Sequence, residues 1–472
     1  MNETTARPNS RAIAAKIIAR WLQTGDFPDR LIEDNVTNRA FVMEVVYGVA
    51  RWKRALEWLV EQLATNKPDA NVLPYLLTGL YQVMFMENVV DYAAVNETIE
   101  AVKESSAPYA AGFVNGVLRN SLRKKDALKA ALETQSVGIR ESHPDILIQR
   151  WLERFGEEKT LALCKWNNSR PNVIIHPNTR LISMHDFVEN LKKSGIKTVP
   201  HRAAPETCLI LPHGTHVIDL PGYQEGMFSI QDPSTFKAVE LLDPKPGELV
   251  LDACAAPGGK TLLIAERMND SGKLIAMDLH DDRLKRLAGN VGRMRLCSIE
   301  ISQGDATREQ DIKRVIDEAS LDASPQVARD RDGSARRLAL PNPPASTKVG
   351  RTVPVSRHGI TEAILFDRIL LDVPCSNTGV LSRRSDARWR FSTKRMSQLV
   401  AVQRAMLSAM ARFLKPGGVL VYSTCSLEPE ECSKMVEAWV AANHNFRLAK
   451  TIEMFPPETH TDGIFAAALI KQ

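Results

Sequence analysis

The sequence predicts an α/β protein whose C-terminal half forms a doubly wound, mostly parallel sheet, preceded by an all-helical domain and a small α+β segment. Three observations support this prediction. Apolar residues recur at helical spacing through the first 138 residues, short β-like runs appear after Asn172, and apolar strands alternate with helices after Gly247. Strands that are apolar on both faces are typical of parallel sheets covered by helices on both sides.

Length and composition indicate a multidomain, water-soluble chain. With 472 residues, the chain is long enough for two or three domains. It is 44% hydrophobic and 25% charged, as is usual for globular proteins. No apolar stretch of about 18 residues and no secretory leader are seen, so we expect a cytoplasmic protein with no membrane partner.

The seven cysteines form neither pairs nor CxxC motifs. Their odd number and scattered positions indicate neither a disulfide framework nor a zinc site, so no metal is expected. The net charge of +5 is compatible with nucleic-acid binding but does not indicate it, because clustering matters more than the sum.

The helical domain is predicted over residues 1–138. Ile13, Ile17 and Trp21 share one helical face, and Gly25 ends the run. Similar stripes predict helices around residues 41–59, 73–84, 95–102 and 113–118. Two basic clusters accompany them, one at residues 51–54 and one at residues 119–125; each is either a solvated helix face or a surface that binds phosphates.

The remaining chain divides into an α+β segment, residues 139–232, and the α/β domain, residues 233–472. Strands of the first are predicted at residues 173–175 and 208–211, and of the second at 249–251, 274–277, 299–301, 369–371 and 419–422. Residues 319–360 are rich in Pro, Arg, Ser and Ala without a period, which indicates a disordered insertion.

A glycine-bearing loop, DACAAPGGKT at residues 252–261, follows the first strand of the α/β domain and opens a helix. It matches neither the GxxxxGK[ST] phosphate loop nor the GxGxxG dinucleotide motif. Its glycines allow close backbone approach to a ligand. Asp278 ends the next strand, where a carboxylate suits a ribose diol, and Asp305 follows the third strand, where it suits an adenine amino group.

Two cysteines follow the last two predicted strands directly. Cys375 lies in DVPCS after Asp372, and Cys425 lies in STCS. A cysteine at a strand end beside a cofactor cleft is a candidate nucleophile if its thiolate is favoured. Strand position alone leaves open which of the two attacks.

DACAAPGGKT, DVPCSNTG and STCS, in this order and spacing, resemble the RNA 5-methylcytosine methyltransferases of the NOL1/NOP2/Sun type. FVNGVLRN near residue 113, SHPDILIQRWLERFG near 142 and the closing DGIFAAALIK resemble the bacterial members that act on 16S ribosomal RNA and begin with a NusB-like RNA-binding domain. The resemblance covers nearly the whole chain. It implies a Rossmann-like methyltransferase domain, the cofactor S-adenosylmethionine, and ribosomal RNA, free or in early assembly, as partner.

The resemblance also implies a role for each motif residue. Cys425 would attack carbon 6 of the cytosine, and Cys375 would assist release of the product. Asp278 would bind the ribose and Asp305 the adenine side, while Asp372 would border both the cofactor and the target base. The methionine moiety would be held by Cys254, Ala255, Ala256, Pro257, Gly258, Gly259 and Lys260.

Two features depart from the family pattern. The segment His176-Pro177-Asn178 replaces an R-x-N pattern, which puts an RNA contact there in doubt, and the insertion at residues 319–360 is longer than expected. Because carbon 5 of cytosine is a poor nucleophile, the implied chemistry needs thiolate addition to an unstacked base held in a pocket, and it needs no metal.

Four rival functions were weighed. An amino-group methyltransferase would show [DN]-P-P-[FY] where this chain has DVPC. A DNA cytosine methyltransferase would use a Pro-Cys nucleophile, which Cys375 could supply, but STCS and the helical domain argue against it. A non-catalytic ribosome assembly factor is disfavoured by the intact Cys425 and glycine loop. A methyltransferase of the same type acting on another RNA stays open.

Overall fold

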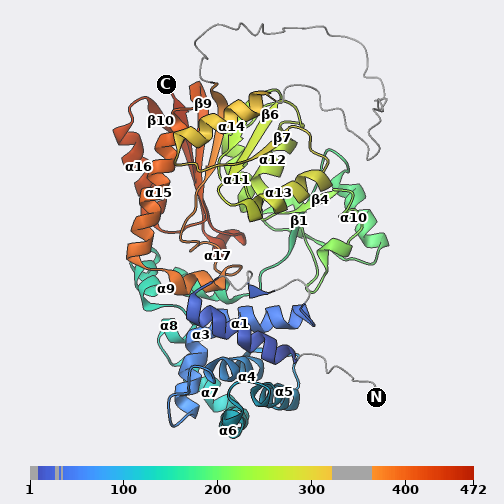
Figure 1. The fold of residues 1–472 in the computed structure, drawn as a ribbon, viewed down its shortest axis with the longest axis vertical. Helices are drawn as coiled ribbons and strands as arrows, with labels where there is room; N and C mark the ends of the chain where they lie inside the picture. Colours follow the sequence, from blue (N-terminus) through green and yellow to red (C-terminus); the bar gives the residue numbers. More distant parts are fainter. Residues whose placement is uncertain (1–8, 27–30, 33–35, 322–363) are drawn as a thin grey trace.

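The computed structural model describes residues 9–26, 31–32, 36–321 and 364–472. A helical domain lies at one end of the molecule and a large sheet covered by helices at the other, with a smaller sheet beside the large one (Figure 1). The predicted insertion falls almost wholly outside the described residues. Its first residues, up to Leu321, complete helix α14.

The N-terminal part is helical, and each of the five helices predicted there is present. Asn9 caps the first helix by accepting from the N–H groups of Arg11 and Ala12, and Gly25 ends it in the left-handed conformation. The elements are α1 (Ser10–Thr24), α3 (Arg39–Leu63), α4 (Leu73–Phe85), α5 (Asp91–Lys103), η1 (Pro108–Ala110), α6 (Ala111–Arg123), α7 (Lys125–Glu133) and α8 (Val137–Arg140).

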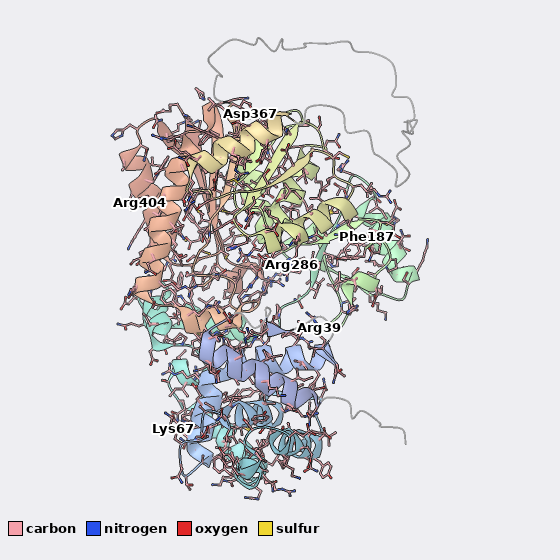
Figure 2. The ribbon with its side chains drawn as sticks, viewed as in Figure 1. Arg39, Lys67, Phe187, Arg286, Asp367 and Arg404 are labelled. Carbon is pink, nitrogen blue, oxygen red and sulfur yellow. The ribbon has the colours of Figure 1, made fainter. Side chains whose placement is uncertain are left out.

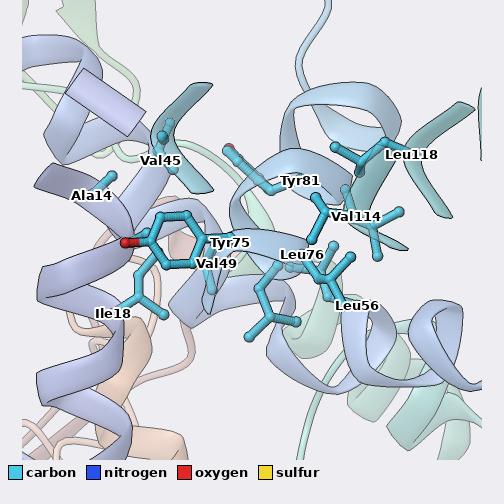
Figure 3. Close-up of a cluster of buried hydrophobic side chains, with 14 of the residues drawn as sticks. Ala14, Ile18, Val45, Val49, Leu56, Tyr75, Leu76, Tyr81, Val114 and Leu118 are labelled. Carbon is cyan, nitrogen blue, oxygen red and sulfur yellow. The ribbon is translucent and has the colours of Figure 1, made fainter. Parts of the chain in front are cut away.

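The core of this domain forms where α3, α4 and α6 cross closely. Figure 3 shows the buried side chains that meet there, among them Val49, Leu76 and Val114. A Cβ on Gly48 would lie 1.9 Å from the Tyr81 ring, and one on Gly79 would lie 2.6 Å from Leu118. The absence of a side chain at these two positions therefore allows the close packing of α4 against α3 and α6.

The long helix α9 (Asp145–Asn168) leads into a small antiparallel sheet with strand order β2-β3-β1-β4. Its apolar core includes Ile175, Phe187 and Phe228, and Phe187 lies within this domain in Figure 2. The two strands predicted here are present. The elements are β1 (Ile174–Pro177), α10 (Met184–Lys193), β2 (Val199–His201), β3 (Ala204–Ile210), η2 (Val217–Asp219) and β4 (Phe228–Ile230).

The large sheet has the order β10-β11-β9-β8-β5-β6-β7, and its five predicted strands are present and mutually parallel. The sequence prediction missed β10 and β11, which add to the edge in antiparallel fashion. The elements are α11 (Ser234–Leu242), β5 (Leu249–Asp252), α12 (Gly259–Arg267), β6 (Lys273–Asp278), α13 (Asp281–Arg293), β7 (Ile299–Gln303), α14 (Glu309–Leu321), β8 (Phe366–Asp372), η3 (Ser385–Arg390), α15 (Thr393–Ala411), β9 (Leu414–Thr424), η4 (Pro429–Glu431), α16 (Ser433–Ala442), β10 (Phe446–Met454), α17 (Pro456–Thr459) and β11 (Ile464–Lys471).

Helices cover both faces of this sheet. One apolar cluster joins α11, α12 and α13 to one face, and another joins α14, α15 and α16 to the other. The predicted doubly wound, mostly parallel fold is therefore confirmed. Asp367, at the start of β8, lies at the end of the sheet away from the helical domain, so the carboxyl ends of the parallel strands point toward that domain (Figure 2).

The short helix η3 joins the α/β domain to the helical domain. Arg388 is fully buried and donates to the backbone oxygens of Arg51, Ser142 and Asn167 and to the side-chain oxygen of Asn168. Burial lowers the pKa of this guanidinium, and the four oxygen acceptors offset part of the cost of desolvating it.

The first basic cluster belongs to this joint rather than to a free surface. Arg51 is buried and donates to the backbone oxygen of Ser382. Arg54 pairs bidentately with Asp145, and Lys53 pairs with Glu57. The ring of Trp389 lies 5.0 Å from the Lys53 ammonium. For Arg51, both interpretations offered for this cluster, a solvated face and a phosphate-binding surface, are therefore wrong, whereas Lys53 and Arg54 are partly exposed and engaged in ion pairs.

We expect Arg388→Met to lower the free energy of unfolding by about 3 kcal/mol, because it leaves several buried oxygens without a donor. Thermal unfolding followed by circular dichroism would measure the loss, and limited proteolysis would show whether the joint opens. Arg404→Met is the matched control, since Arg404 is exposed on α15 (Figure 2). Equal stability of the two variants would show that the buried guanidinium does not hold the joint.

Candidate cofactor and nucleophile site

The carboxyl ends of β5 and β8 lie side by side where the strand order of the large sheet reverses direction. The chain passes from β5 outward to β6 and β7, then returns to place β8 on the other side of β5. In doubly wound sheets, such a switch point opens a crevice in which ligands bind. The predicted glycine-bearing loop follows β5 and the DVPCS motif follows β8, so the structure brings both to this crevice.

The loop after β5 is tied to its neighbours through its backbone. The backbone N–H of Ala253 donates to the backbone oxygen of Leu370 on β8, and the backbone N–H of Ala255 donates to that of Met277 on β6. Gly258 adopts a φ of +112°, in the left-handed region that disfavours side chains, and a Cβ there would also meet Leu287 at 2.5 Å. The loop therefore turns tightly into α12, whose first backbone N–H groups have no partners within the helix.

Lys260 joins the loop to the strand that precedes Cys375. Its ammonium lies 2.6 Å from the Asp372 carboxylate, whose other oxygen accepts from the Ser423 hydroxyl at 2.5 Å. Asp372 on β8 thus bridges α12 to β9. This chain of contacts connects the two predicted parts of the site, the cofactor loop and the cysteine loops.

Asp252 at the end of β5 has an unsatisfied oxygen. Its Oδ2 accepts from Thr261, but Oδ1 has no hydrogen-bond partner although the residue is almost fully buried. Burial, together with a smaller contribution from the charge of Asp372, raises the pKa of this carboxyl to about 7. A buried oxygen without a partner, beside a turn that excludes side chains, fits a polar cofactor in this crevice.

Asp278 ends β6 and Asp305 follows β7, as predicted. Asp278 is buried and accepts from the backbone N–H groups of Ala256 and His280. Each of its oxygens keeps a further lone pair for a ligand. Asp305 accepts from the N–H and hydroxyl of Thr307 in the turn before α14, and Arg308 lies 3.4 Å from its second oxygen.

The two candidate cysteines are brought together by the parallel pairing of β8 and β9. The Sγ atoms of Cys375 and Cys425 lie 3.2 Å apart, and the Cys425 thiol lies 3.4 Å from the side-chain oxygen of Asn377. The hydrogen bond to Cys375, together with burial, raises the pKa of Cys425 well above its ordinary value, whereas Lys260 lowers it. Cys375 also lines a pocket bounded by Asn377 and the first turn of α15.

The segment that departs from the family pattern serves an internal contact. His176 on β1 is buried, with Nε2 3.0 Å from the Glu266 carboxylate of α12 and Nδ1 2.7 Å from the backbone oxygen of Thr207. It therefore attaches the small sheet to the helix that follows the cofactor loop.

Sequence reasoning did not identify Arg383, which clamps three parts of the chain beside the site. It pairs with Asp462 and Asp232 and donates to the backbone oxygen of Asn172. The Asp462 side chain is mostly buried, with 14% of its surface exposed, and this burial raises the pKa of its carboxyl to about 7. The signal available in the sequence was weak, because these residues are separated by up to 290 positions and none lies in a predicted strand-end motif.

The fold and this site define an S-adenosylmethionine-dependent methyltransferase. The doubly wound sheet, the loop at its switch point and the carboxylate after β6 together form the nucleoside-binding arrangement of that class. Comparison with known sequences then places the chain more narrowly. It belongs to the 16S rRNA methyltransferase RsmB/F family, whose model matches residues 239–342 and 334–470.

Two further family models match the preceding parts. Residues 8–123 match the NusB family, and residues 143–217 match the ferredoxin-like domain of RsmF/B-like methyltransferases. The chain is 32% identical to the ribosomal RNA small subunit methyltransferase B of Vibrio cholerae, over 98% of each chain. It is 31% identical to the probable ribosomal RNA small subunit methyltransferase B of Synechocystis, covering 92% of this chain and 87% of that one.

Among solved structures, the one described as PH0851 superposes with a TM-score of 0.72 at 22% identity, over 98% of this chain and 99% of that chain. This likeness extends the shared fold through all three parts of the chain. Within the described residues, no helix has both the length and the apolar character to cross a membrane.

The pKa of Asp252 predicts how stability responds to pH. The folded protein takes up a proton near pH 7, whereas the unfolded chain takes it up only near the ordinary value of 3.8. Stability therefore rises as the pH falls from about 7 to about 4, by up to about 1.4 kcal/mol per pH unit from this group. We expect Asp252→Asn to flatten this dependence in the cofactor-free protein, measured as the unfolding midpoint at each pH.

Asp317→Asn is the control for this measurement, because Asp317 is exposed on α14. In Asp252→Asn, the slope of stability against pH should decrease but not vanish, since Asp462 titrates in the same pH range. If Asp252→Asn and Asp317→Asn show the same slope as the parent, Asp252 does not take up a proton near neutrality.

Proposed function

We propose that the protein transfers a methyl group from S-adenosylmethionine to carbon 5 of a cytosine in 16S ribosomal RNA, through a covalent bond between Cys425 and carbon 6. The observation that supports this most directly is the pair of thiols, Cys375 and Cys425, 3.2 Å apart beside the cofactor loop. A methyltransferase that acts on an exocyclic amino group needs no thiol, whereas attack at a ring carbon needs a nucleophile.

The cofactor supplies an electrophilic methyl group when bound. Cys254 to Lys260 would hold its methionine part against the start of α12, Asp278 would accept from the ribose hydroxyls, and Asp305 would face the adenine side. The unpartnered Oδ1 of Asp252 would be a further acceptor for a polar group of the bound cofactor. Asp372, held between Lys260 and Ser423, would lie where cofactor and target base meet.

The thiol of Cys425 is mostly protonated at neutral pH, so attack requires that it lose its proton when the base arrives. The ammonium of Lys260 favours the thiolate. The thiolate adds to carbon 6 of the unstacked cytosine, and carbon 5 would then displace the methyl group from the sulfonium sulfur, which leaves as the thioether of S-adenosylhomocysteine. A base then takes the proton from carbon 5, the double bond between carbons 5 and 6 re-forms, and the bond between the Cys425 sulfur and carbon 6 breaks, so that the thiolate returns. Cys375 assists this last stage from its place beside Cys425.

We expect replacement of each of the two cysteines to block a different step of the reaction. Cys425→Ala should abolish both methylation and the covalent protein–RNA adduct, because no thiolate adds to the base. Cys375→Ala should still form the adduct but fail to resolve it, so conjugates accumulate that survive denaturing gels. RNA containing 5-fluorocytosine should trap the parent protein, since fluorine cannot leave as a cation.

Cys297→Ala is the matched control, because Cys297 is an exposed cysteine outside the site. It should methylate and release RNA as the parent does. An adduct with Cys425→Ala and none with Cys375→Ala would reverse the two roles. Bisulfite sequencing of 16S RNA from a deletion strain would identify the modified cytosine, and an unchanged profile there would exclude 16S RNA as the substrate.

The second basic cluster supports a role for the helical domain in binding RNA. Arg119, Arg123 and Lys124 are exposed at the C-terminal end of α6, and the side chains of both arginines donate to asparagines within that helix. Gly112 and Gly116, earlier on α6, have open space around them, so the helix backbone is accessible there. An accessible backbone with cations beside it suits a phosphate chain.

Reversing the charges of Arg119, Arg123 and Lys124 to glutamate should weaken RNA binding and reduce its salt dependence. The slope of log K against log salt should fall by about one for each side chain that contacts a phosphate. Fluorescence anisotropy across a salt series measures both effects. The control reverses Arg404, Lys434 and Arg447, which are exposed on the α/β domain. Equal losses of RNA affinity in the two triple variants would mean that α6 contributes only to the net charge of the protein and is not a specific RNA contact.

A further inference from the structure

Glu431, at the end of η4, is a fully buried carboxylate whose four hydrogen bonds go mainly to the cysteine loops. Its Oε1 accepts from the backbone N–H of Ser376 at 2.9 Å and from the side-chain amide of Gln403 at 3.1 Å. Its Oε2 accepts from the hydroxyl of Ser376 and, at 2.6 Å, from the hydroxyl of Ser426. Ser376 follows Cys375 and Ser426 follows Cys425, so one carboxylate binds the residue next to each thiol.

Gln403 extends the contact to the other side of Cys375. Its amide nitrogen also donates to the backbone oxygen of Pro374 at 2.9 Å. Gln403 lies on α15 and is fully buried, and the Tyr422 hydroxyl, which donates to the Glu431 backbone oxygen, lies 3.2 Å from its side-chain oxygen. Both neighbours of Cys375 are therefore held by side chains from other elements.

These contacts exceed what packing alone requires. An unpaired buried carboxylate is costly, and a pair of leucine-sized side chains could fill the same space without that cost. Four donors satisfy the carboxylate completely, and a fully satisfied polar network holds its members in one arrangement. The two serine hydroxyls lie 3.0 Å apart because both point to the same oxygen, and the thiols beside them lie 3.2 Å apart.

We propose that Glu431 is a positioning residue that holds the Cys375 and Cys425 loops at the spacing their chemistry needs. Its action is indirect, since it contacts the serines and neither thiol. The proposal rests on the proposed function, because the spacing matters only if both thiols act on one base. Glu431 would then set the rate of the covalent steps and leave the binding of cofactor and RNA unchanged.

Three variants test this role. Glu431→Ala removes all four contacts, and kcat should fall about 100-fold while KM for RNA and for S-adenosylmethionine stay the same, as expected when reacting groups are displaced by about 1 Å. Glu431→Gln should restore most of the rate, because its amide can donate to both serine hydroxyls where the carboxylate accepted. Ser376→Ala combined with Ser426→Ala keeps the carboxylate and should lose part of the rate.

A second measurement reports the spacing without any methylation. Phenylarsine oxide bridges two thiols held side by side, so intact-protein mass spectrometry should show one bridged arsenical in the parent protein. Cys425→Ala should abolish the bridge and Cys297→Ala should not. Glu431→Ala should bridge much more slowly than Glu431→Gln, with both variants folded by circular dichroism.

The outcomes separate the two proposals. Rapid bridging and normal kcat in Glu431→Ala would overturn the positioning role. If Glu431→Ala does not fold, the two-serine variant decides: normal bridging and kcat there would overturn the role equally. If bridging depends on Glu431 but no cytosine is methylated by the parent protein, the spacing role stands and the proposed reaction fails.

Discussion

The burial of Arg388 is the constraint on which the relative placement of the domains depends. A guanidinium in the protein interior is tolerated only where oxygens surround it. Here those oxygens come from α3, from the turn before α9 and from the end of α9, while the arginine itself belongs to the α/β domain. Together the three elements supply acceptors for both terminal nitrogens of the guanidinium, while its Nε has no hydrogen-bond partner. The helical domain is thereby held against the chain segment that begins at the Cys375 loop.

The second constraint is the register of the parallel strands. Because β5, β6, β8 and β9 run in the same direction, the residues after each strand meet along one edge of the sheet. Asp372 is aligned with Ser423 across the β8–β9 pair, and this alignment puts Cys375 and Cys425 within contact distance. Lys260 then links that pair of strands to the cofactor loop. The cofactor loop and the two thiols are adjacent because of strand pairing, although the residues come from segments more than 100 positions apart.

Much of the fold and the composition of the site followed from local patterns in the sequence. Periodic apolar stripes predicted α1 and α3 to α6, and apolar runs ending in Asp252, Asp278 and Asp372 predicted both the strands and the edge at which they meet. The predictions failed where the outcome depends on distant partners. β10 is an edge strand with mostly exposed residues, so no apolar run marks it. The cluster at Arg51 has the composition of a surface patch, and only the position of Ser382 and Arg388 shows that Arg51 itself is buried. Glu431 lies in an acidic stretch that gives no sign of its four buried donors.

The close pair of thiols has a consequence for chemical reactivity outside the methylation cycle. A thiol is attacked by electrophiles and oxidants mainly as its thiolate, and burial together with the Cys375 contact keeps Cys425 protonated in the resting protein. An alkylating agent in solution would therefore meet the exposed Cys297 first. A covalent inhibitor directed at Cys425 would therefore gain little from a more reactive electrophilic group. It would need to bind beside the two thiols and promote loss of the Cys425 proton there.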